Sequence, residues 1–276
     1  MRRAMSTLIS ARGERLGTAL LEQFVAGGAE AVEIFAARGH FNYTERRHVR
    51  EIANWFRSTG VTFHSMHSPM YSDEEWGRGG KPPVNIAAVE KRERIAALDE
   101  IKRALEVAEQ APFRFLVQHV GVGDEEASGR KQEAAISSLE QLQIFARPLG
   151  VQLLVENIPN ELSTPEKLIG LLDTGGFPDI GVCFDLGHAH IMSSVKQAFD
   201  VMKDRIRSTH VHDNLKDQDS HLWPGEGSID WSEAMPLLRT APHVPPVLFE
   251  IEGVEGEDIS GRMAAAFSRL EREQAV

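Results

Sequence analysis

Strand-like and helix-like segments alternate from one end of this sequence to the other. Such alternation is typical of a parallel α/β fold, because a crossover segment, usually a helix, must connect each parallel strand to the next. Eight strands are predicted: Thr7–Ser10, Ala31–Phe35, Val61–His67, Phe113–His119, Val151–Glu156, Ile180–Asp185, Ile206–His212 and Val247–Ile251. The predicted helices are Arg12–Ala26, Glu45–Ser58, Val89–Glu109, Lys131–Arg147, Pro165–Leu172, Val195–Lys203, Trp231–Leu238 and Ile259–Glu273.

The number of strands and the length of the chain favour a closed barrel. A chain of 276 residues has the size of a single eight-stranded α/β barrel. An open doubly wound sheet also alternates strand and helix, but it usually carries a Gly-rich phosphate loop after its first strand. The segment here, SARGERLG, contains neither GxGxxG nor GxxxxGK[ST]. We therefore predict an α/β protein with one (β/α)8 TIM barrel domain spanning residues 1–276.

Charge and composition limit the kinds of binding partner and the cellular compartment that we expect for this protein. The formal net charge of −11 argues against passive attraction to nucleic acid or anionic lipid. Cys183 is the single cysteine, so an intrachain disulfide is impossible. The N-terminal MRRAMSTLIS lacks the apolar stretch of a signal peptide, and no run approaches the roughly 18 apolar residues of a membrane span. A cytoplasmic protein without membrane contact is expected.

Four apolar runs in the C-terminal half each end in a metal-type ligand. The terminal residues are Glu156, Asp185, His210 and Glu250, which lie 29, 25 and 40 residues apart. These gaps approach the roughly 30 residues of one strand-plus-helix unit in a barrel. A charged side chain closing an apolar strand is costly unless it is paired, hydrogen-bonded or bound to a cation. The pattern predicts a shared metal ion at the barrel mouth. His212 points to the same side of its strand as His210 and is the second choice.

Histidines concentrate in the same places. Imidazole is the commonest protein ligand for transition metals, and mixed His and carboxylate sets suit Mn²⁺, Co²⁺, Fe²⁺ or Zn²⁺. Long loops follow the third and seventh predicted strands, on the face where barrel enzymes build their sites. Eight of the eleven histidines fall at predicted strand ends or in the loops just after them: His64, His67, His119, His188, His190, His210, His212 and His221.

Several motifs resemble those of the xylose isomerase-like barrels, a superfamily that includes sugar phosphate isomerases and epimerases, sugar 3-epimerases and endonuclease IV. The motifs are VENIPNE, CFDLGHAH, THVHDN followed by DSHLWPGEGSIDW, and LFEIEG. The resemblance implies that Glu156, Asp185, His210 and Glu250 hold one divalent ion (Mn, Zn, Co or Mg), with Asp213 as the acidic partner of His210. It further implies a sugar or sugar phosphate isomerase or epimerase. Glu156 and Glu250 would be its catalytic carboxylates, taking and returning a substrate proton through an enediolate.

The same resemblance offers an alternative, a zinc-dependent AP endonuclease that hydrolyses a phosphodiester with three zinc ions. Under this interpretation nine residues are ligands: His67, His119, Glu156, Asp185, His188, His210, Asp219, His221 and Glu250. The long loops weaken it, because their few basic residues, Arg78, Lys81 and Lys216, are outnumbered by acidic ones.

The substrate expected is therefore a small sugar or sugar-like molecule, and a nucleic acid partner is expected only under the alternative. His67, His119, His188, His212, Asp219 and His221 are expected to bind substrate or additional metal. Trp55, Trp76 or Trp223 could stack on a sugar face, although packing is the favoured interpretation for each of them taken alone. No Gly-rich phosphate cradle follows the last two strands, so a non-phosphorylated substrate is equally admissible. A homo-oligomer is compatible with the resemblance.

Overall fold

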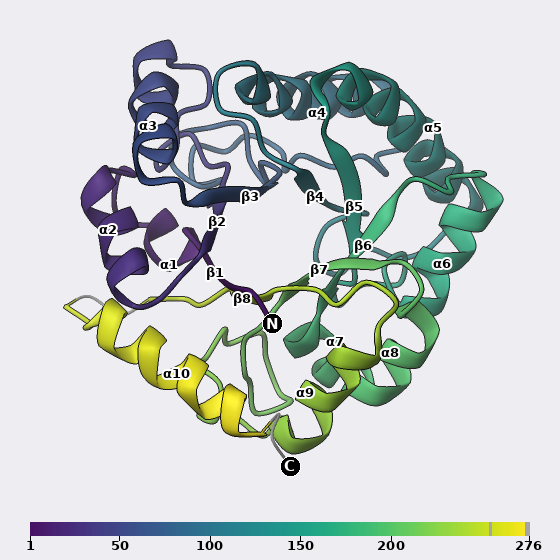
Figure 1. The fold of residues 1–276 in the computed structure, drawn as a ribbon. Helices are drawn as coiled ribbons and strands as arrows, with labels where there is room; N and C mark the ends of the chain where they lie inside the picture. The colour runs from purple at the N-terminus through teal and green to yellow at the C-terminus, as the bar shows by residue number, and fades with distance from the viewer. Residues whose placement is uncertain (254–255, 274–276) are drawn as a thin grey trace.

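A ring of eight parallel strands surrounded by helices forms the core of the protein (Figure 1). The computed structural model describes residues 1–253 and 256–273. The strands pair in the order β7-β6-β5-β4-β3-β2-β1-β8, and a parallel bridge between Val211 and Phe249 joins the two ends. The predicted TIM barrel is thereby confirmed. The strands are β1 Arg3–Ser6, β2 Ala31–Phe35, β3 Thr62–His67, β4 Phe115–His119, β5 Gln152–Glu156, β6 Gly181–Asp185, β7 Ile206–His210 and β8 Val247–Phe249.

Helices cover the outside of the ring. Those expected between the strands are α2 Thr18–Ala26, α3 Arg46–Thr59, α4 Lys91–Leu105, α5 Gly129–Ala146, α6 Pro165–Thr174, α8 Val195–Met202, α9 Trp231–Thr240 and α10 Ile259–Glu273. Two short α-helices, α1 Leu8–Ala11 and α7 Leu186–Met192, and two 3₁₀ turns, η1 Glu106–Glu109 and η2 Arg147–Leu149, were not predicted separately.

The first predicted strand is wrong. The apolar run Thr7–Ser10 does not enter the sheet, because the preceding Arg3–Ser6 pairs with both β2 and β8. Leu8 and Ala11 lie instead on α1, where they pack against Phe35, the last residue of β2. The prediction failed because a short apolar run is compatible with both a strand and a buried helical turn, and periodicity does not distinguish them.

Capping residues lie at the ends of several of the helices. Thr164 caps α6 by accepting a hydrogen bond from the Lys167 N–H, and Pro165 occupies the first helical position. Gly60 and Gly150 adopt left-handed conformations at φ +72° directly after α3 and η2, where a side chain would add strain.

Most of the apolar core lies between the sheet and the helices, as the wide cluster of buried side chains on both elements shows. Small clusters fill the barrel interior below the strand ends: Phe115, Val117, Leu154 and Cys183 in one, and Ala4, Ala31 and Leu248 in the other. These layers support the polar residues at the C-terminal mouth. Within the described residues, no helix is both long and apolar enough to span a membrane.

Candidate metal centre

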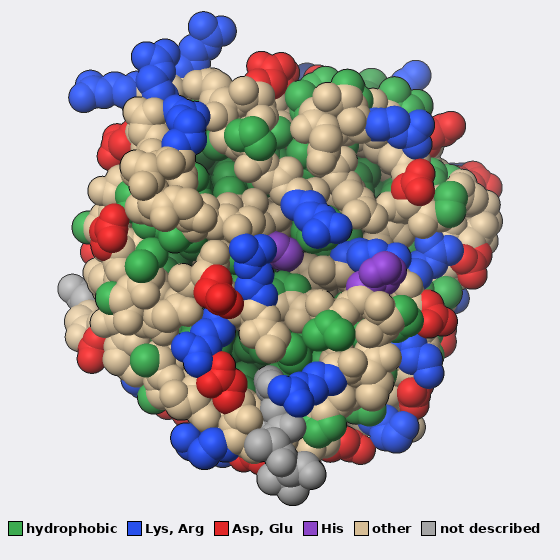
Figure 2. Space-filling model, in the orientation of Figure 1, with side chains coloured by type: hydrophobic (Ala, Val, Ile, Leu, Met, Phe, Trp, Pro, Cys, Tyr) green, Lys and Arg blue, Asp and Glu red, His purple; other side chains and the backbone are tan. Residues whose placement is uncertain are grey.

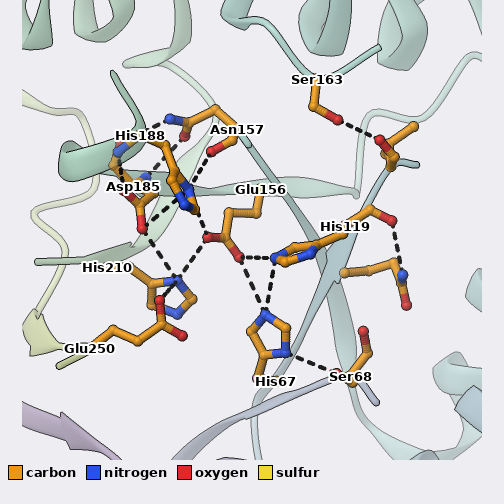
Figure 3. A network of polar contacts seen from close by, with 12 residues as sticks. His67, Ser68, His119, Glu156, Asn157, Ser163, Asp185, His188, His210 and Glu250 are labelled. Carbon is orange, nitrogen blue, oxygen red and sulfur yellow. Dashed lines mark hydrogen bonds and ion pairs between the residues drawn. The ribbon is translucent and has the colours of Figure 1, made fainter. Parts of the chain in front are cut away.

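Three groups of ligand-type side chains meet at the C-terminal ends of the strands. In each group one candidate ligand atom per residue lies within 4.8 Å of the others. Figure 3 shows Glu156 in the middle of the network, between His119 and His67 on one side and His210 on the other. The groups are Glu156, Asp185, His210 and Glu250 (the tetrad); His67, His119 and Glu156 (the second cluster); and His188, His212, Asp219 and His221 (the third cluster).

The tetrad contains the four residues that close the apolar runs of the sequence. Glu156, Asp185 and His210 are the last residues of β5, β6 and β7, and Glu250 directly follows β8. All four side chains are buried. The Nδ1 atom of His210 lies 3.0 Å from Oε1 of Glu156, 3.2 Å from Oε2 of Glu250 and 3.9 Å from Oδ2 of Asp185. Three carboxylates around one imidazole nitrogen need a proton or a cation between them, and the donor set suits a divalent ion.

Glu33 on β2 is a site residue that the sequence did not reveal. Its fully buried carboxylate lies 3.0 and 3.2 Å from Nε2 of His210 and accepts a 2.7 Å hydrogen bond from the Ser65 hydroxyl. A carboxylate accepts, so Nε2 carries the proton and the lone pair of Nδ1 faces the tetrad. The prediction that Asp213 is the acidic partner of His210 is therefore wrong. The carboxylate oxygens of Asp213 accept instead from the backbone N–H groups of Gly225 and Ile229.

The second cluster places two imidazoles against the same carboxylate. Nε2 of His67 lies 3.1 Å from Nε2 of His119, and Oε2 of Glu156 lies 3.6 and 3.2 Å from these two atoms. This oxygen is buried and accepts no hydrogen bond in the described part of the chain. An orphaned carboxylate oxygen facing two ring nitrogens fits a second cation, which Glu156 would share with the tetrad.

The third cluster is built around Asp219, which is in the loop after β7. Its Oδ2 atom lies 3.0 Å from Nε2 of His188 and 3.1 Å from Nε2 of His221. His212 belongs to this cluster and not to the tetrad, where His210 stands. Its Nε2 atom lies 3.1 Å from Oδ2 of Asp185, so the third cluster adjoins the tetrad through that carboxylate.

Backbone carbonyl groups determine which ring nitrogen carries the proton in three of the histidines. Nδ1 of His67, His188 and His221 lies 2.8, 2.9 and 2.8 Å from the carbonyl oxygens of Ser68, Asn157 and Glu250 respectively. Because a carbonyl only accepts, each Nδ1 donates its proton and each Nε2 presents a lone pair to its cluster. Metal-ligating histidines show this arrangement, in which the second nitrogen fixes the ring and its tautomer.

Two local features hold the third cluster in shape. A Cβ on Gly187 would lie 2.0 Å from Cε1 of His212, so only glycine lets α7 approach this ring. His221 has φ +42°, a left-handed conformation that costs a non-glycine residue energy and is typical of functional sites. The loop around it is tied to Asp213, which also accepts a 2.9 Å hydrogen bond from the Trp231 indole.

Burial and neighbouring charges shift the pKa values of the centre in opposite directions. Burial opposes ionisation of Glu156, but His210 and His119 beside it hold its pKa well below the usual range. Burial raises the pKa of Glu250 to about 7, and the attraction of His210 only partly offsets this. Desolvation works against the charged form of His210, yet the adjacent acidic groups, Glu250 and Glu156 among them, raise its pKa well above 6.5. Glu250 is therefore the carboxylate closest to exchanging a proton near neutral pH.

A cavity of about 440 Å³ opens onto the clusters. Its lining combines cluster residues, Glu156, His119, His188, Asp219 and Glu250 among them, with the less polar side chains of Leu8, Phe35, Met70, Tyr71, Trp76 and Ile158. Arg12 is the one Arg or Lys among its lining residues, and its guanidinium is already paired with Glu252 at 2.7 Å. Of the three tryptophans considered for sugar stacking, Trp76 lines this cavity, whereas Trp55 and Trp223 are buried in the core.

The family of the chain follows from a sequence comparison. The family model described as "Xylose isomerase-like TIM barrel" matches residues 21–271. The chain belongs to this family. The match covers β2 to β8 and every residue of the three clusters, so the resemblance expected from the motifs is confirmed.

Individual relatives are distant. The uncharacterized protein MJ1311 of Methanocaldococcus jannaschii is 28% identical over 166 residues, which span 56% of this chain and 57% of that protein. Among solved structures, a D-tagatose 3-epimerase-like protein is 22% identical with a TM-score of 0.81, over 100% of this chain and 98% of the other. A D-psicose 3-epimerase is 13% identical with a TM-score of 0.77, over the whole of both chains. At such identities these similarities show the fold alone.

Proposed function

We propose that the protein is a divalent-metal-dependent isomerase or epimerase acting on a sugar or sugar-like substrate. The observation that carries the proposal is the placement of Glu156 and Glu250. Both carboxylates lie within 3.2 Å of His210 Nδ1, one ends β5 and the other directly follows β8, and both line the same cavity. Neighbouring folds named as sugar epimerases support the proposal.

The chain's own residues divide the work of proton transfer. One of the two carboxylates, Glu156 or Glu250, takes a proton from the substrate carbon, and the other, which has first taken up a proton from solvent, returns one. An ion held by the tetrad would supply polarisation of the substrate oxygens. His188 would orient substrate oxygens inside the cavity, and Trp76 would pack against the sugar.

The cavity favours an uncharged substrate over a polyanion. Binding of a nucleic acid needs Lys and Arg against its phosphates, whereas the single arginine here is neutralised by Glu252. Five carboxylates line the same cavity: Asp124, Glu156, Asp219, Glu250 and Glu252.

The test is solvent deuterium incorporation at substrate carbons, followed by NMR on a panel of ketoses and aldoses. Glu156→Gln and Glu250→Gln are each expected to lower exchange and turnover at least about 100-fold, the usual contribution of a positioned proton-transfer group. Glu252→Gln, which changes a carboxylate at the rim of the same cavity, is the matched control. Full turnover in either of the first two variants would show the paired-carboxylate mechanism to be wrong.

A second candidate function, hydrolysis of a phosphoester by several metal ions, is favoured by one observation. The tetrad is continuous with two further clusters, through the shared Glu156 and through the contact between Asp185 and His212. A single-ion isomerase does not require them, whereas adjacent ions suit phosphoester cleavage. Elemental analysis distinguishes the two: about one ion per chain supports the isomerase. Three zinc ions together with nicking of abasic duplex DNA support the second candidate.

The single domain over residues 1–276 and a homo-oligomeric state remain predictions. Light scattering of the purified protein, together with limited proteolysis, would test both.

A further inference from the structure

Arginines gather at the end of the barrel opposite the metal clusters. Arg2 directly precedes β1, Arg114 directly precedes β4, and Arg207 is the second residue of β7. The N-terminal ends of the strands of a parallel barrel meet at one mouth, so these positions share it. Figure 2 shows blue Lys and Arg side chains close to a purple His side chain near the centre of the visible face.

Two irregularities in the sheet direct side chains towards this mouth. The register between β2 and β3 shifts so that His64 is unpaired, and the register between β6 and β7 shifts so that Arg207 is unpaired. Such β-bulges re-aim a side chain and are common at barrel rims. Gly181 on β6 makes the room, because a Cβ there would lie 2.7 Å from Cγ of Arg207.

The hydrogen bonds of β3 place two of these arginines next to His64: the backbone N–H of Arg114 donates to the His64 carbonyl oxygen at 3.2 Å, and Arg2 donates to the hydroxyl of Thr62, two residues before His64. Its ring is buried and its Nε2 lies 3.0 Å from the Ser208 hydroxyl across the barrel. Burial lowers the pKa of His64 to about 4, against the pull of Glu33, and the guanidinium groups of Arg2 and Arg114 add to the lowering. Burial likewise lowers the pKa of Arg207, with Arg205 and Arg114 adding to it.

Within residues 1–253 and 256–273, no carboxylate pairs with the guanidinium of Arg2, Arg114 or Arg207. Arg2 donates to the Thr62 hydroxyl and Arg207 to the backbone carbonyls of Asp204 and Ile206. The Arg114 guanidinium lies over the Phe115 ring at 4.9 Å and donates no hydrogen bond to the described part of the chain. Its donors are therefore free for a ligand.

From this arrangement we propose that Arg2, Arg114 and Arg207 form a binding site for a phosphate group at the N-terminal mouth of the barrel. Guanidinium groups offer planar pairs of donors that match phosphate oxygens, and an anion would relieve the repulsion among them. The ligand is inorganic phosphate or a small phosphomonoester, since the same oxygens would be recognised in both. The site goes beyond the proposed function, because none of its residues belongs to the metal clusters or lines the cavity above them.

Isothermal titration of the metal-loaded protein tests the site, with inorganic phosphate and glycerol phosphate as probes and potassium chloride at matched ionic strength as the blank. Arg114→Gln is expected to weaken binding about tenfold or more, since a hydrogen bond to a charged group contributes roughly 1.5–3 kcal/mol. Arg114 is exposed and its side chain donates no hydrogen bond to the described residues, so its replacement should leave the fold intact; Arg207→Gln is the second variant. Arg130→Gln, an exposed arginine on α5, is the matched control and should bind like the wild type.

The relative affinity of the two probes identifies which form the site prefers. Phosphate binding that is unchanged in both Arg114→Gln and Arg207→Gln belongs to the metal centre and would overturn the proposal. Wild-type binding no stronger than the chloride blank would overturn it as well. Neither result depends on turnover, so failure of the phosphate site would leave the proposed sugar chemistry untouched.

Discussion

Replacement of Glu33 by glutamine should lower the metal affinity of the tetrad without changing any of its four residues. Glu33 is fully buried and its carboxylate faces Nε2 of His210 at 3.0 and 3.2 Å. Glutamine has nearly the same shape, and its amide oxygen can still accept from Nε2. The negative charge that makes Nδ1 a stronger ligand is lost. The amide nitrogen must also turn to the Ser65 hydroxyl, which now donates to Glu33 at 2.7 Å.

The expected magnitude follows from the type of contact. Loss of a carboxylate behind a ligating histidine typically lowers metal affinity 10–100-fold, which corresponds to about 1.4–2.7 kcal/mol. Competition between the protein and a chromophoric chelator for Co²⁺ or Zn²⁺ measures this change directly. The most tightly bound ion of the wild type should shift by that factor in Glu33→Gln.

A matched control separates this effect from the general cost of losing a buried carboxylate. Glu100 on α4 is also buried, and it accepts from Arg38 and Arg103 away from the clusters. Glu100→Gln should lower the melting temperature but leave metal affinity unchanged. Metal affinity of Glu33→Gln within about threefold of the wild type, in a folded protein, would refute the assignment of the His210 tautomer.

Three further predictions concern the third cluster, metal removal and pH. Gly187→Ala should displace His212, since the added Cβ would lie 2.0 Å from its ring, and elemental analysis should find less bound metal; Gly170→Ala, with open space around it, is the control. Chelation should lower the melting temperature by roughly 10 °C, because saturating metal at about 1,000 times its Kd stabilises by about 4 kcal/mol, and added Zn²⁺ should restore it. In the metal-free protein the Glu250 pKa of about 7 lies above its unfolded value near 4.5, so its contribution to stability is present below pH 4.5 and is lost as the pH rises through 7. Melting curves of Glu250→Gln should lack this part of the slope, and an unchanged slope would contradict the raised pKa.

The sequence predicted the barrel and the four residues of the tetrad because both depend on local patterns. Each apolar run contains a strand with a ligand-type side chain at or directly after its end, and the topology of a parallel barrel brings these ends together. The choice between His210 and His212 could not be made from two positions on one side of a strand. The strand ends at His210, and the chain beyond it carries His212 into contact with Asp185 and the third cluster.

Long-range partners were beyond the reach of the sequence. Glu33 lies in AVEIF, which reads as an ordinary strand, and its partner His210 is 177 residues away. Asp213 satisfied a local spacing pattern, yet its oxygens hold the following loop because the backbone N–H groups of Gly225 and Ile229 turn back to it. The unpaired positions of His64 and Arg207 depend on register shifts, which no periodicity of the single chain records.

The position of Glu156 between two clusters has a consequence for how the protein takes up metal. Each of its oxygens serves a different group, Oε1 the tetrad and Oε2 the pair His67 and His119. The first ion to arrive would draw electron density from a ligand that the second also needs, while fixing the geometry that the second requires. If both groups hold an ion, as the multi-metal candidate requires, loading should therefore be stepwise and interdependent, and a titration curve described by identical, independent sites would not fit it.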